Sequence, residues 1–316
     1  MANFNISAPS TNSNATASPL ASVLTFTVSL LGVLGNFILL SVILTAKKLK
    51  DPSYTFITNV TVSDLLMALQ VCFLFLPNNL TKHFFFYNGI LACRLLYSVF
   101  YASYNASVFS LTMISIYRYK IVIKPLRYRL SPSSFKYTKI IIISIWIVSI
   151  LNCIPTFLLT NYSVKYKVCD VSYPYGTAFN IFYYVSVFTV TYILPVLIML
   201  VNYLKIGCKL SSQTSPLTHT FTDARQISMR SKAVIKFLVG VTAVYMLLSW
   251  PFVFGIMAMS IAKTTISQLI QDFSVAPQLL TYSFATSMLV SIINPILYLM
   301  FDKNIKSEIR RKIYKI

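Results

Sequence analysis

Among the polar side chains within long apolar stretches of this sequence, the strongest cases are Asn36, Asp64 and Asn294. Polar groups are costly in apolar surroundings unless they are paired, so residues of this kind usually have a function. Asp64 is the only acidic residue placed deep in such a stretch. Its carboxyl group is therefore expected either to bind a hard cation or to take up a proton.

Oxygen atoms from other apolar stretches are available to surround Asp64. We predict a candidate sodium site formed by Asp64, Ser107, Ser291 and Asn294, since a hard cation prefers oxygen ligands. The alternative is a protonated Asp64 that is hydrogen-bonded to Asn36 and Asn294. Both arrangements satisfy the carboxyl group, and the sequence leaves the choice open.

A permanently charged side chain marks the end of another apolar stretch. Arg118 stands between Tyr117 and Tyr119, where an apolar segment from Cys93 to Ile116 stops and a basic one begins. Arginine does not lose its charge in proteins, so at such a boundary it is either an anchor or a working part. The sequence shows no nucleophile paired with a base and no metal-binding cluster, so we predict that the protein is not an enzyme.

The elements that must position these residues are long apolar helices. Hydrophobic residues make up 56% of the 316 and charged residues only 11%, which is too apolar for a soluble domain. Crossing a hydrocarbon core takes about 20 helical residues. Seven such spans are predicted, at 20–46, 53–78, 91–120, 138–159, 177–205, 233–260 and 276–300. We predict an all-α membrane protein whose residues 20–300 form a seven-transmembrane helix bundle.

The basic residues are distributed unequally between the two sides of these spans. Of 27 Lys and Arg residues, all but five fall on the side of the C-terminus, and the five are Lys82, Arg94, Lys165, Lys167 and Lys263. The positive-inside rule then predicts a multi-pass protein of the plasma membrane with its N-terminus outside and its C-terminus in the cytosol. Topology and contact with anionic membrane lipid account for the net charge of +20, so no nucleic acid partner is predicted.

The two chain ends differ in composition. Residues 1–19 are rich in Ser, Thr, Asn and Ala, and we predict a disordered extracellular tail without a signal peptide. Residues 301–316 repeat an apolar residue every four positions among Lys and Arg, at Phe301, Ile305, Ile309 and Ile313. This pattern predicts a short amphipathic cytosolic helix 8 that lies on the anionic inner leaflet.

The outer side carries candidates for covalent modification. Cys93 and Cys169 both fall on the oxidising face, where a disulfide between them would tie the loop before the fifth span over the bundle. Asn5, Asn14 and Asn161 begin glycosylation sequons on the same side.

Together these residues resemble the rhodopsin-like (class A) family of G-protein-coupled receptors over nearly the whole chain. The resemblance is carried by Gly35-Asn36, Ser63-Asp64-Leu65-Leu66, Cys93, Ser115-Ile116-Tyr117-Arg118-Tyr119, Pro125-Leu126, Trp146, Cys169, Pro195, Tyr203, Trp250-Pro251 and Asn294-Pro295-Ile296-Leu297-Tyr298. In that family an outside ligand biases an equilibrium between inactive and active states, the inner end of the sixth helix swings outward, and a heterotrimeric G protein binds. The resemblance implies roles in activation and coupling for Arg118, Tyr119, Tyr203, Asn294, Pro295 and Tyr298.

The chain departs from the family around its arginine and its tryptophan. Tyr117 stands where Asp or Glu is usual, and residues 230–236 at the base of the sixth span contain no carboxylate. Arg118 is therefore expected to lack both acidic partners, which predicts raised basal coupling. The alternative is that hydrogen bonds from Tyr117, Tyr119 or water restrain it. Trp250 directly precedes Pro251, whereas the family's tryptophan usually stands one position earlier.

The resemblance also restricts the ligand. Phe100 occupies the position at which amine receptors carry an aspartate, and Met288 that of the opsin lysine, so an amine counter-ion and a retinal Schiff base are both excluded. Aromatic side chains near the outer ends of the spans suit an apolar ligand or a peptide with apolar anchors. The predicted pocket contains Phe100, Tyr101, Tyr104, Tyr184, Trp250, Tyr282 and Met288.

We therefore predict a G-protein-coupled receptor that transduces an extracellular peptide or non-aminergic small molecule into activation of a heterotrimeric G protein. Its other partner is membrane lipid, and its only candidate cofactor is an allosteric sodium ion. The alternatives are a chemosensory, odorant-type receptor and a ligand-independent, constitutively active receptor. An ion-coupled transporter or channel built around Asp64 is less favoured, because further intramembrane charges and related half-repeats are lacking.

Overall fold

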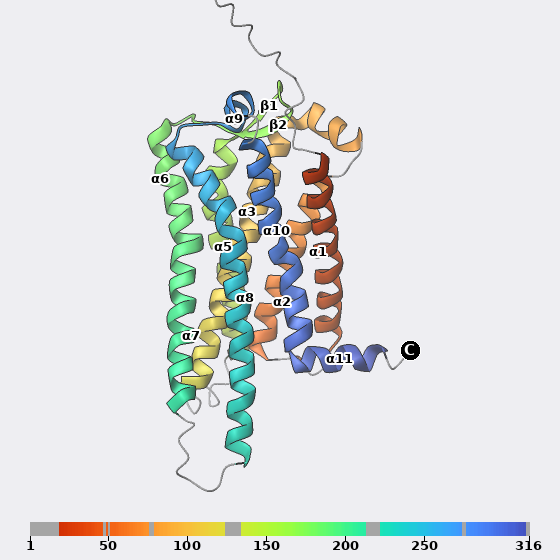
Figure 1. Cartoon of the computed structure of the whole chain (residues 1–316), viewed down its shortest axis with the longest axis vertical. Coiled ribbons are helices and arrows are strands. Elements are labelled where there is room, and N and C mark those ends of the chain that lie inside the picture. The colour runs from red at the N-terminus through yellow and green to blue at the C-terminus, as the bar shows by residue number, and fades with distance from the viewer. Residues whose placement is uncertain are drawn as a thin grey trace, which may run out of the picture.

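A computed structural model of the chain describes residues 19–46, 49, 51–75, 79–123, 134–212, 222–273 and 276–313. Seven long apolar helical segments lie side by side (Figure 1), which confirms the predicted seven-helix bundle. They are α1 (Pro19–Thr45), α2 (Pro52–Leu74), α3 (Asn79–Ile123), α5 (Ser134–Leu159), α6 (Thr177–Phe188) continued by η1 (Thr189–Ile193) and α7 (Leu194–Ser212), α8 (Thr222–Ile261) and α10 (Ala276–Phe301).

Several helix ends differ from the predicted spans. Helix α2 ends at Leu74, before the predicted position 78, whereas α3 begins at Asn79 and α8 at Thr222, ahead of the predicted 91 and 233. Hydropathy marks only the part of a helix that suits the hydrocarbon core, and backbone hydrogen bonds continue the helix into polar sequence. The apolar pattern therefore does not predict how far a helix extends beyond the hydrocarbon core of the membrane.

Large apolar side chains cover the outside of the bundle, and polar ones lie within it. Phe37 is 61% exposed on α1, whereas its neighbour Asn36 is fully buried, as is Asp64 on α2. Lipid tails solvate the apolar exterior, so the interior is free to hold polar groups that pair with one another. The functional candidates are consequently concentrated along the axis of the bundle.

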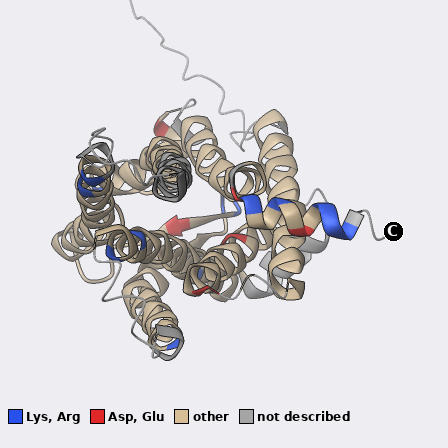
Figure 2. Cartoon of the chain, turned by 90° about the horizontal axis from the view of Figure 1, so that it is seen from below, with Lys and Arg blue, Asp and Glu red and all other residues tan. Residues whose placement is uncertain are grey.

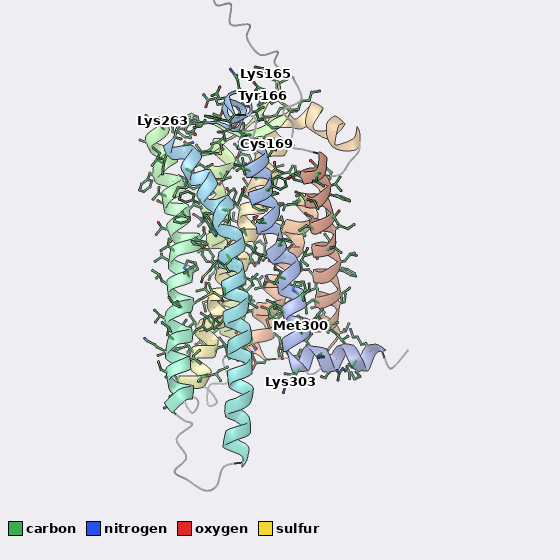
Figure 3. All side chains as sticks on the ribbon, viewed as in Figure 1. Lys165, Tyr166, Cys169, Lys263, Met300 and Lys303 are labelled. Carbon is green, nitrogen blue, oxygen red and sulfur yellow. A yellow bond between two sulfur atoms is a disulfide. The ribbon has the colours of Figure 1, made fainter. Side chains whose placement is uncertain are left out.

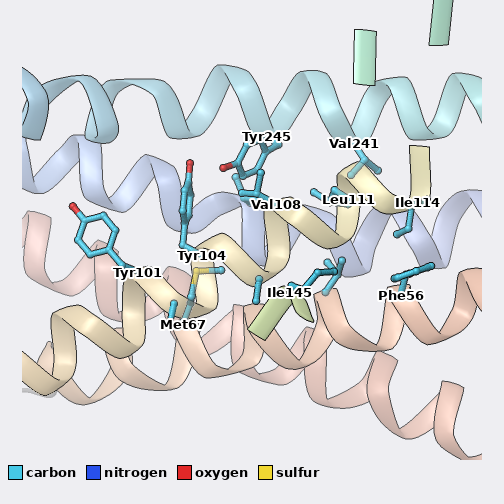
Figure 4. Close-up of a cluster of buried hydrophobic side chains, with 14 of the residues drawn as sticks. Phe56, Met67, Tyr101, Tyr104, Val108, Leu111, Ile114, Ile145, Val241 and Tyr245 are labelled. Carbon is cyan, nitrogen blue, oxygen red and sulfur yellow. The ribbon is translucent and has the colours of Figure 1, made fainter. Parts of the chain in front are cut away.

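The core of the bundle is built around α3. Figure 4 shows Tyr104, Val108 and Leu111 of this helix between neighbouring helices, with Tyr245 of α8 facing Tyr104. The two tyrosine rings have centroids 5.8 Å apart. Side chains on several sides of α3 are buried, so a shift of this helix is felt by most of the others.

Two glycines allow α1 and α10 to approach closely. A Cβ atom at Gly32 would meet Ser291 Oγ at 2.6 Å, and one at Gly35 would meet Pro295 Cγ at 3.1 Å. Both glycines lie one helical turn or less from Asn36, so their small size brings its amide within reach of the α10 backbone.

Pro195 is the second residue of α7, two positions after the end of the π-helical segment η1. Proline has no backbone N–H to donate to the carbonyl four residues earlier, and a wider turn accommodates this gap in the ladder. Pro155, Pro251 and Pro295 instead lie inside α5, α8 and α10.

A small cap lies over one end of the bundle, which we call the outer end. It consists of the antiparallel strands β1 (Thr160–Ser163) and β2 (Val168–Val171), with Asn161 opposite Asp170, and the helix α9 (Ile266–Asp272) lies against it (Figure 1). Cys169 of β2 forms the predicted disulfide with Cys93 of α3, with a Cα–Cα distance of 5.4 Å. Figure 3 labels Cys169 at this end of the bundle, together with Lys165, Tyr166 and Lys263.

The opposite, inner end carries the short C-terminal helix α11 (Lys303–Ile313), as predicted. Figure 2 shows its Lys and Arg residues on a helix that runs away from the bundle. Ile305 is fully buried, so this member of the predicted lipid-facing stripe packs against the bundle instead. Farther along α11, the Lys312 ammonium donates to the backbone oxygen of Ser41 at 3.2 Å and to Thr45 Oγ1 at the end of α1, so this part of the helix also contacts the bundle. The side chains of Phe301 and Ile313 are outside the described residues.

Candidate functional site

The buried carboxylate of Asp64 joins three helices. Its Oδ1 accepts a hydrogen bond from Ser107 Oγ of α3 at 2.8 Å, and its Oδ2 accepts one from Asn294 Nδ2 of α10 at 2.7 Å. All three side chains are at most 2% exposed. A carboxylate that is buried and fully engaged in this way is the feature that both sequence-based interpretations required.

The fourth predicted member of the cation site lies slightly apart. Ser291 Oγ donates to the backbone oxygen of Met288 at 2.7 Å, and its own backbone oxygen accepts from Asn36 Nδ2 at 2.7 Å. Asn36 also donates to Gly32 O at 2.9 Å. The predicted hydrogen bond from Asn36 to Asp64 is therefore wrong, because the close approach of α1 and α10 gives the amide backbone partners instead.

The donor set around Asp64 fits a hard monovalent cation. The carboxylate and the Ser107 hydroxyl present oxygen atoms, and the Ser291 hydroxyl keeps acceptor capacity while it donates to Met288. Asn294 directs its amide nitrogen at the carboxylate, so it contributes to such a site only if the amide turns its oxygen inward.

A second polar junction was missed by the sequence analysis. Asn59 Nδ2 of α2 donates to Ser110 Oγ of α3 at 2.7 Å, and its Oδ1 accepts from Trp146 Nε1 of α5 at 2.9 Å. Asn59 is 7% exposed. A buried asparagine in an apolar span was the available signal, and it fixes α2, α3 and α5 relative to one another.

Arg118 is linked to an acidic residue that its own helix does not supply. Its Nη2 lies 3.4 Å from Ser53 Oγ of α2, and Ser53 Oγ donates to Asp51 Oδ1 at 2.6 Å. The Tyr117 hydroxyl donates to the same oxygen at 3.1 Å. Neither of the two positions at which the family usually has an acid carries one in this sequence, as expected, but Asp51 at the start of α2 is linked to Arg118 through Ser53. Side chains at the base of α8, residues 230–236, are outside the described residues.

Two tyrosines that the resemblance implicated lie near Arg118. Tyr203 on α7 and Tyr298 on α10 lie within range of the charge of Arg118, and both side chains are buried. Thr242 Oγ1 of α8 lies 3.4 Å from the Tyr203 hydroxyl. Parts of four helices therefore meet at this inner cluster. Tyr119 is placed apart, with Lys205 of α7 5.8 Å above its ring centroid.

Asp302 forms a separate junction at the inner end, between α10 and α11. It accepts from the Tyr54 hydroxyl at 3.2 Å and from the backbone N–H of Asn304 at 2.9 Å, while Asn304 Nδ2 donates to the same hydroxyl at 2.8 Å. The carboxylate therefore caps the start of α11 and holds it against α2. Pro295 lies above this junction, inside α10.

Phenylalanine rings from three helices, and one from the residue that follows α2, pack together below the cap. Phe100 of α3 lies 5.2 Å from Phe284 of α10 and 6.1 Å from Phe252 of α8, measured between ring centroids. Phe252 and Phe284 are 5.1 Å apart, and Phe75, which follows α2, stacks on Phe284 at 6.3 Å. We call these four residues the aromatic cluster. Contacts at these distances and tilts are favourable.

The predicted pocket residues are divided by the structure. Phe100, Tyr101, Tyr104, Tyr184 and Met288 are buried near the bundle axis, and Tyr282 is 38% exposed.

Trp250 requires a correction. It is 47% exposed and lies against Phe254, which is 48% exposed on the same face of α8. One residue of helix corresponds to a rotation of about 100°, so the tryptophan next to Pro251 faces outward. Phe252, 5% exposed, takes the inward position.

Asp170 joins the cap to α9. Its Oδ1 accepts from the backbone N–H of Ile266 at 2.7 Å, and its Oδ2 accepts from that of Ser267 at 3.2 Å. The Tyr173 hydroxyl adds a hydrogen bond to Thr264 O at 2.9 Å. Because the neighbouring Cys169 is bonded to α3, these contacts tie the loop before α10 to the centre of the bundle.

A small cavity lies directly beneath these contacts. Phenol groups, threonines and Asp170 line it, together with apolar side chains: Tyr97, Tyr101, Thr156, Thr160, Asp170, Val171, Tyr184, Ile256 and Ile266. Tyr101 and Tyr184 of the predicted pocket thus border a real cavity. Of the predicted glycosylation sites, Asn161 is exposed in β1, whereas Asn5 and Asn14 are outside the described residues.

Comparison with known proteins identifies one family. A sequence model described as 7 transmembrane receptor (rhodopsin family) matches residues 35–298. The neuromedin-K receptors of Oryctolagus cuniculus and Homo sapiens are each 29% identical to the chain over 283 residues, covering 88% of it and 58% of the relative. That of Rattus norvegicus is 28% identical over 282 residues, with coverages of 88% and 60%. The chain thus spans about three fifths of the length of these curated relatives.

Proposed function

Because this chain belongs to the rhodopsin family of seven-transmembrane receptors, we propose that it transmits the binding of an extracellular peptide to a heterotrimeric G protein. The observation that carries the proposal is Arg118 at the inner end of α3, beside Tyr203 of α7 and Tyr298 of α10. The family is one of receptors and not of enzymes. A charged group that several helices share is suited to report their relative movement.

The ligand that we propose is a peptide. The relatives are named as receptors for neuromedin K, which supports a peptide over an odorant. Phe100 lies in the aromatic cluster, whose four described members offer a buried ammonium group only phenyl rings and no carboxylate. Asp170 is engaged with Ile266 and Ser267. Apolar side chains of a peptide would find aromatic partners below the cap.

We propose that a regulatory sodium ion is held by Asp64, Ser107, Ser291 and Asn294. The oxygen atoms of Asp64, Ser107 and Ser291 support this assignment, and Asn294 would join them with its amide oxygen turned inward. A bound sodium ion would compensate the charge of Asp64 and so stabilise the arrangement in which α2, α3 and α10 are held together.

Orientation and membrane contacts complete the proposal. We assign the cap to the extracellular side of the plasma membrane and α11 to the cytosolic side, as the distribution of basic residues predicts. The amphipathic α11 would contact anionic lipid through its basic residues. Asn161, exposed in β1, is then available for glycosylation, as Asn5 and Asn14 would be in the extracellular tail.

The experiment is nucleotide exchange on purified G proteins by the receptor in lipid nanodiscs, with peptide and odorant libraries that include neuromedin K. We expect one or more peptides to raise exchange in the wild type and not in Arg118→Ala. Lys120→Ala removes an exposed charge two positions away and is the matched control.

Each other result has a defined meaning. Activation by odorants alone would replace the peptide by a chemosensory ligand. Exchange that depends on Arg118 but on no ligand would favour a constitutive receptor. Exchange that never exceeds the level of Arg118→Ala would refute the proposed coupling.

A further inference from the structure

Asp51 is linked through Ser53 to Arg118, the residue that carries the proposed function. The proposed function itself gives Asp51 no role. It accepts three hydrogen bonds through Oδ1: from Ser53 N at 2.8 Å, from Ser53 Oγ at 2.6 Å and from the Tyr117 hydroxyl at 3.1 Å. Arg118 Nη2 approaches Ser53 Oγ at 3.4 Å. We propose that Asp51 is the acidic positioning residue that restrains Arg118, through the hydroxyl of Ser53, in the resting state.

The chemistry of the serine hydroxyl fixes the direction of this relay. A hydroxyl has one proton and two lone pairs, and a guanidinium has donors only. Ser53 therefore donates its proton to the carboxylate and accepts from Arg118. Polarisation by the negative charge makes the Ser53 oxygen a better acceptor, so the carboxylate acts on the arginine without touching it.

The carboxylate is held in place by the start of α2. Asp51 is the N-cap of this helix, with extended backbone angles, and Pro52 occupies the first helical position. Both features pre-organise a helix start. Ser53 is 1% exposed, so its hydroxyl has little freedom to choose other partners. Asp51 is thus a fixed acceptor, even though its own side chain is exposed to solvent.

Tyr117 has a consistent place in this arrangement. It is 7% exposed and directs its hydroxyl to the same Asp51 oxygen that holds Ser53. A carboxylate at position 117 would instead repel Asp51. The tyrosine before the arginine therefore complements an acid on the neighbouring helix, and two successive residues of α3 are attached to one group on α2.

The other acid nearby is a natural control. Asp302 also caps a helix and contacts α2, but through Tyr54. Within the described ranges no hydrogen bond or ion pair joins Asp302 to Arg118. Asp51→Asn and Asp302→Asn each remove one negative charge and keep an amide that can cap a helix, since Asn is as good an N-cap as Asp.

The inference rests on the proposed coupling role of Arg118, so one measurement must not depend on a G protein. In nanodiscs, the rate at which phenylglyoxal modifies Arg118 is read by mass spectrometry. We expect Asp51→Asn and Ser53→Ala to raise this rate about fivefold, the ratio that corresponds to about 1 kcal/mol of lost restraint. Asp302→Asn and Ser53→Thr should leave it near the wild-type rate.

Agonist-free nucleotide exchange on the same preparations supplies the second measurement. It should rise by a similar factor in Asp51→Asn and fall to the level of Arg118→Ala in the double variant Asp51→Asn/Arg118→Ala. An unchanged modification rate in Asp51→Asn would overturn the restraint, whatever the exchange data show. A raised modification rate with no exchange by any variant would uphold the restraint and refute the proposed coupling instead. Equal increases in Asp51→Asn and Asp302→Asn would show a general loosening of the inner end and overturn the proposal.

Discussion

Replacing Asp170 by alanine is expected to release α9 from the cap. The variant loses the acceptors for the backbone N–H groups of Ile266 and Ser267, which lie 2.7 and 3.2 Å from the carboxylate. These donors belong to the first turn of α9, where a helix has no carbonyl of its own to offer. The Asp170 carboxylate therefore supplies the hydrogen-bond acceptors that the first turn of α9 lacks, and it also connects α9 to β2.

The expected size of the effect follows from helix capping. Replacing a capping side chain by alanine costs about 0.5–2 kcal/mol. The opening equilibrium of α9 should then increase roughly 2- to 30-fold, since 1.4 kcal/mol is a factor of ten. Helix α9 has its own capping box, in which Thr265 and Gln268 satisfy each other's backbone N–H groups. Loss of Asp170 should consequently detach the helix more than it unfolds it.

Amide hydrogen exchange, resolved to single residues by fragmentation, measures this opening directly. The amides of Ile266 and Ser267 should exchange faster in Asp170→Ala by the stated factor. The amide of Gln268 is protected from within α9 by Thr265 Oγ1 at 3.1 Å and should change less. Asp272→Ala removes the exposed acid at the other end of α9 and is the control variant.

Two results would refute this reasoning. Unchanged exchange at Ile266 and Ser267 would mean that the carboxylate does not hold α9. Equal acceleration in Asp272→Ala would mean that the helix responds to net charge and not to the hydrogen bonds. If the prediction holds, the same variant should bind and release an extracellular ligand faster, because Asp170 and Ile266 both border the small cavity at the outer end.

Three further outcomes are expected. Phe252→Ala should lower the free energy of unfolding by about 3–5 kcal/mol in a thermal assay, because a buried ring is lost from the aromatic cluster. Replacing the outward-facing Trp250 by alanine should lower it by less than about 1 kcal/mol. A larger loss in the Trp250 variant than in the Phe252 variant would contradict the assigned helix rotation. Sodium at ten times its Kd should stabilise the wild type by about 1.4 kcal/mol over a potassium buffer and leave Asp64→Asn unaffected, and a retained sodium effect would remove Asp64 from the site. Burial and, secondarily, the Asp170 carboxylate raise the pKa of Tyr173 above its usual 10.0. The contribution of Tyr173 to stability is therefore complete below about pH 10 and is lost as the pH rises through the folded-state pKa. Tyr173→Phe should flatten the alkaline part of a plot of unfolding temperature against pH, and a plot identical to that of the wild type would exclude this cause.

Local chemistry was sufficient to predict the membrane helices and their polar residues. The number of spans follows from hydropathy, because each segment chooses lipid or water largely by its own composition. The disulfide followed from the placement of Cys93 and Cys169 on one side of the membrane. Asp64 was recognised as a buried, paired carboxyl group because an isolated charge is too costly there, and Ser107 and Asn294 were correctly predicted to surround it.

Partners that lie on different helices required the three-dimensional structure. Nothing near Arg118 in the sequence announces Ser53, which is 65 positions away, or Asp51 beyond it. The family usually has an acid next to the arginine or at the base of the sixth span, and this sequence has none at position 117 or in residues 230–236. Helix packing supplied the acid from α2 instead.

The sequence by itself determined which residues would enter the membrane and on which side the charges would gather, because partitioning between lipid and water depends on each side chain and its immediate neighbours. The tertiary structure alone decided the rotation of each helix about its axis. That rotation turned Trp250 outward and Phe252 inward, gave Asn36 backbone partners on α10, and brought the hydroxyl of Ser53 between Asp51 and Arg118. Rotation depends on how many side chains from several helices fit together at once, and no single segment of sequence contains that information.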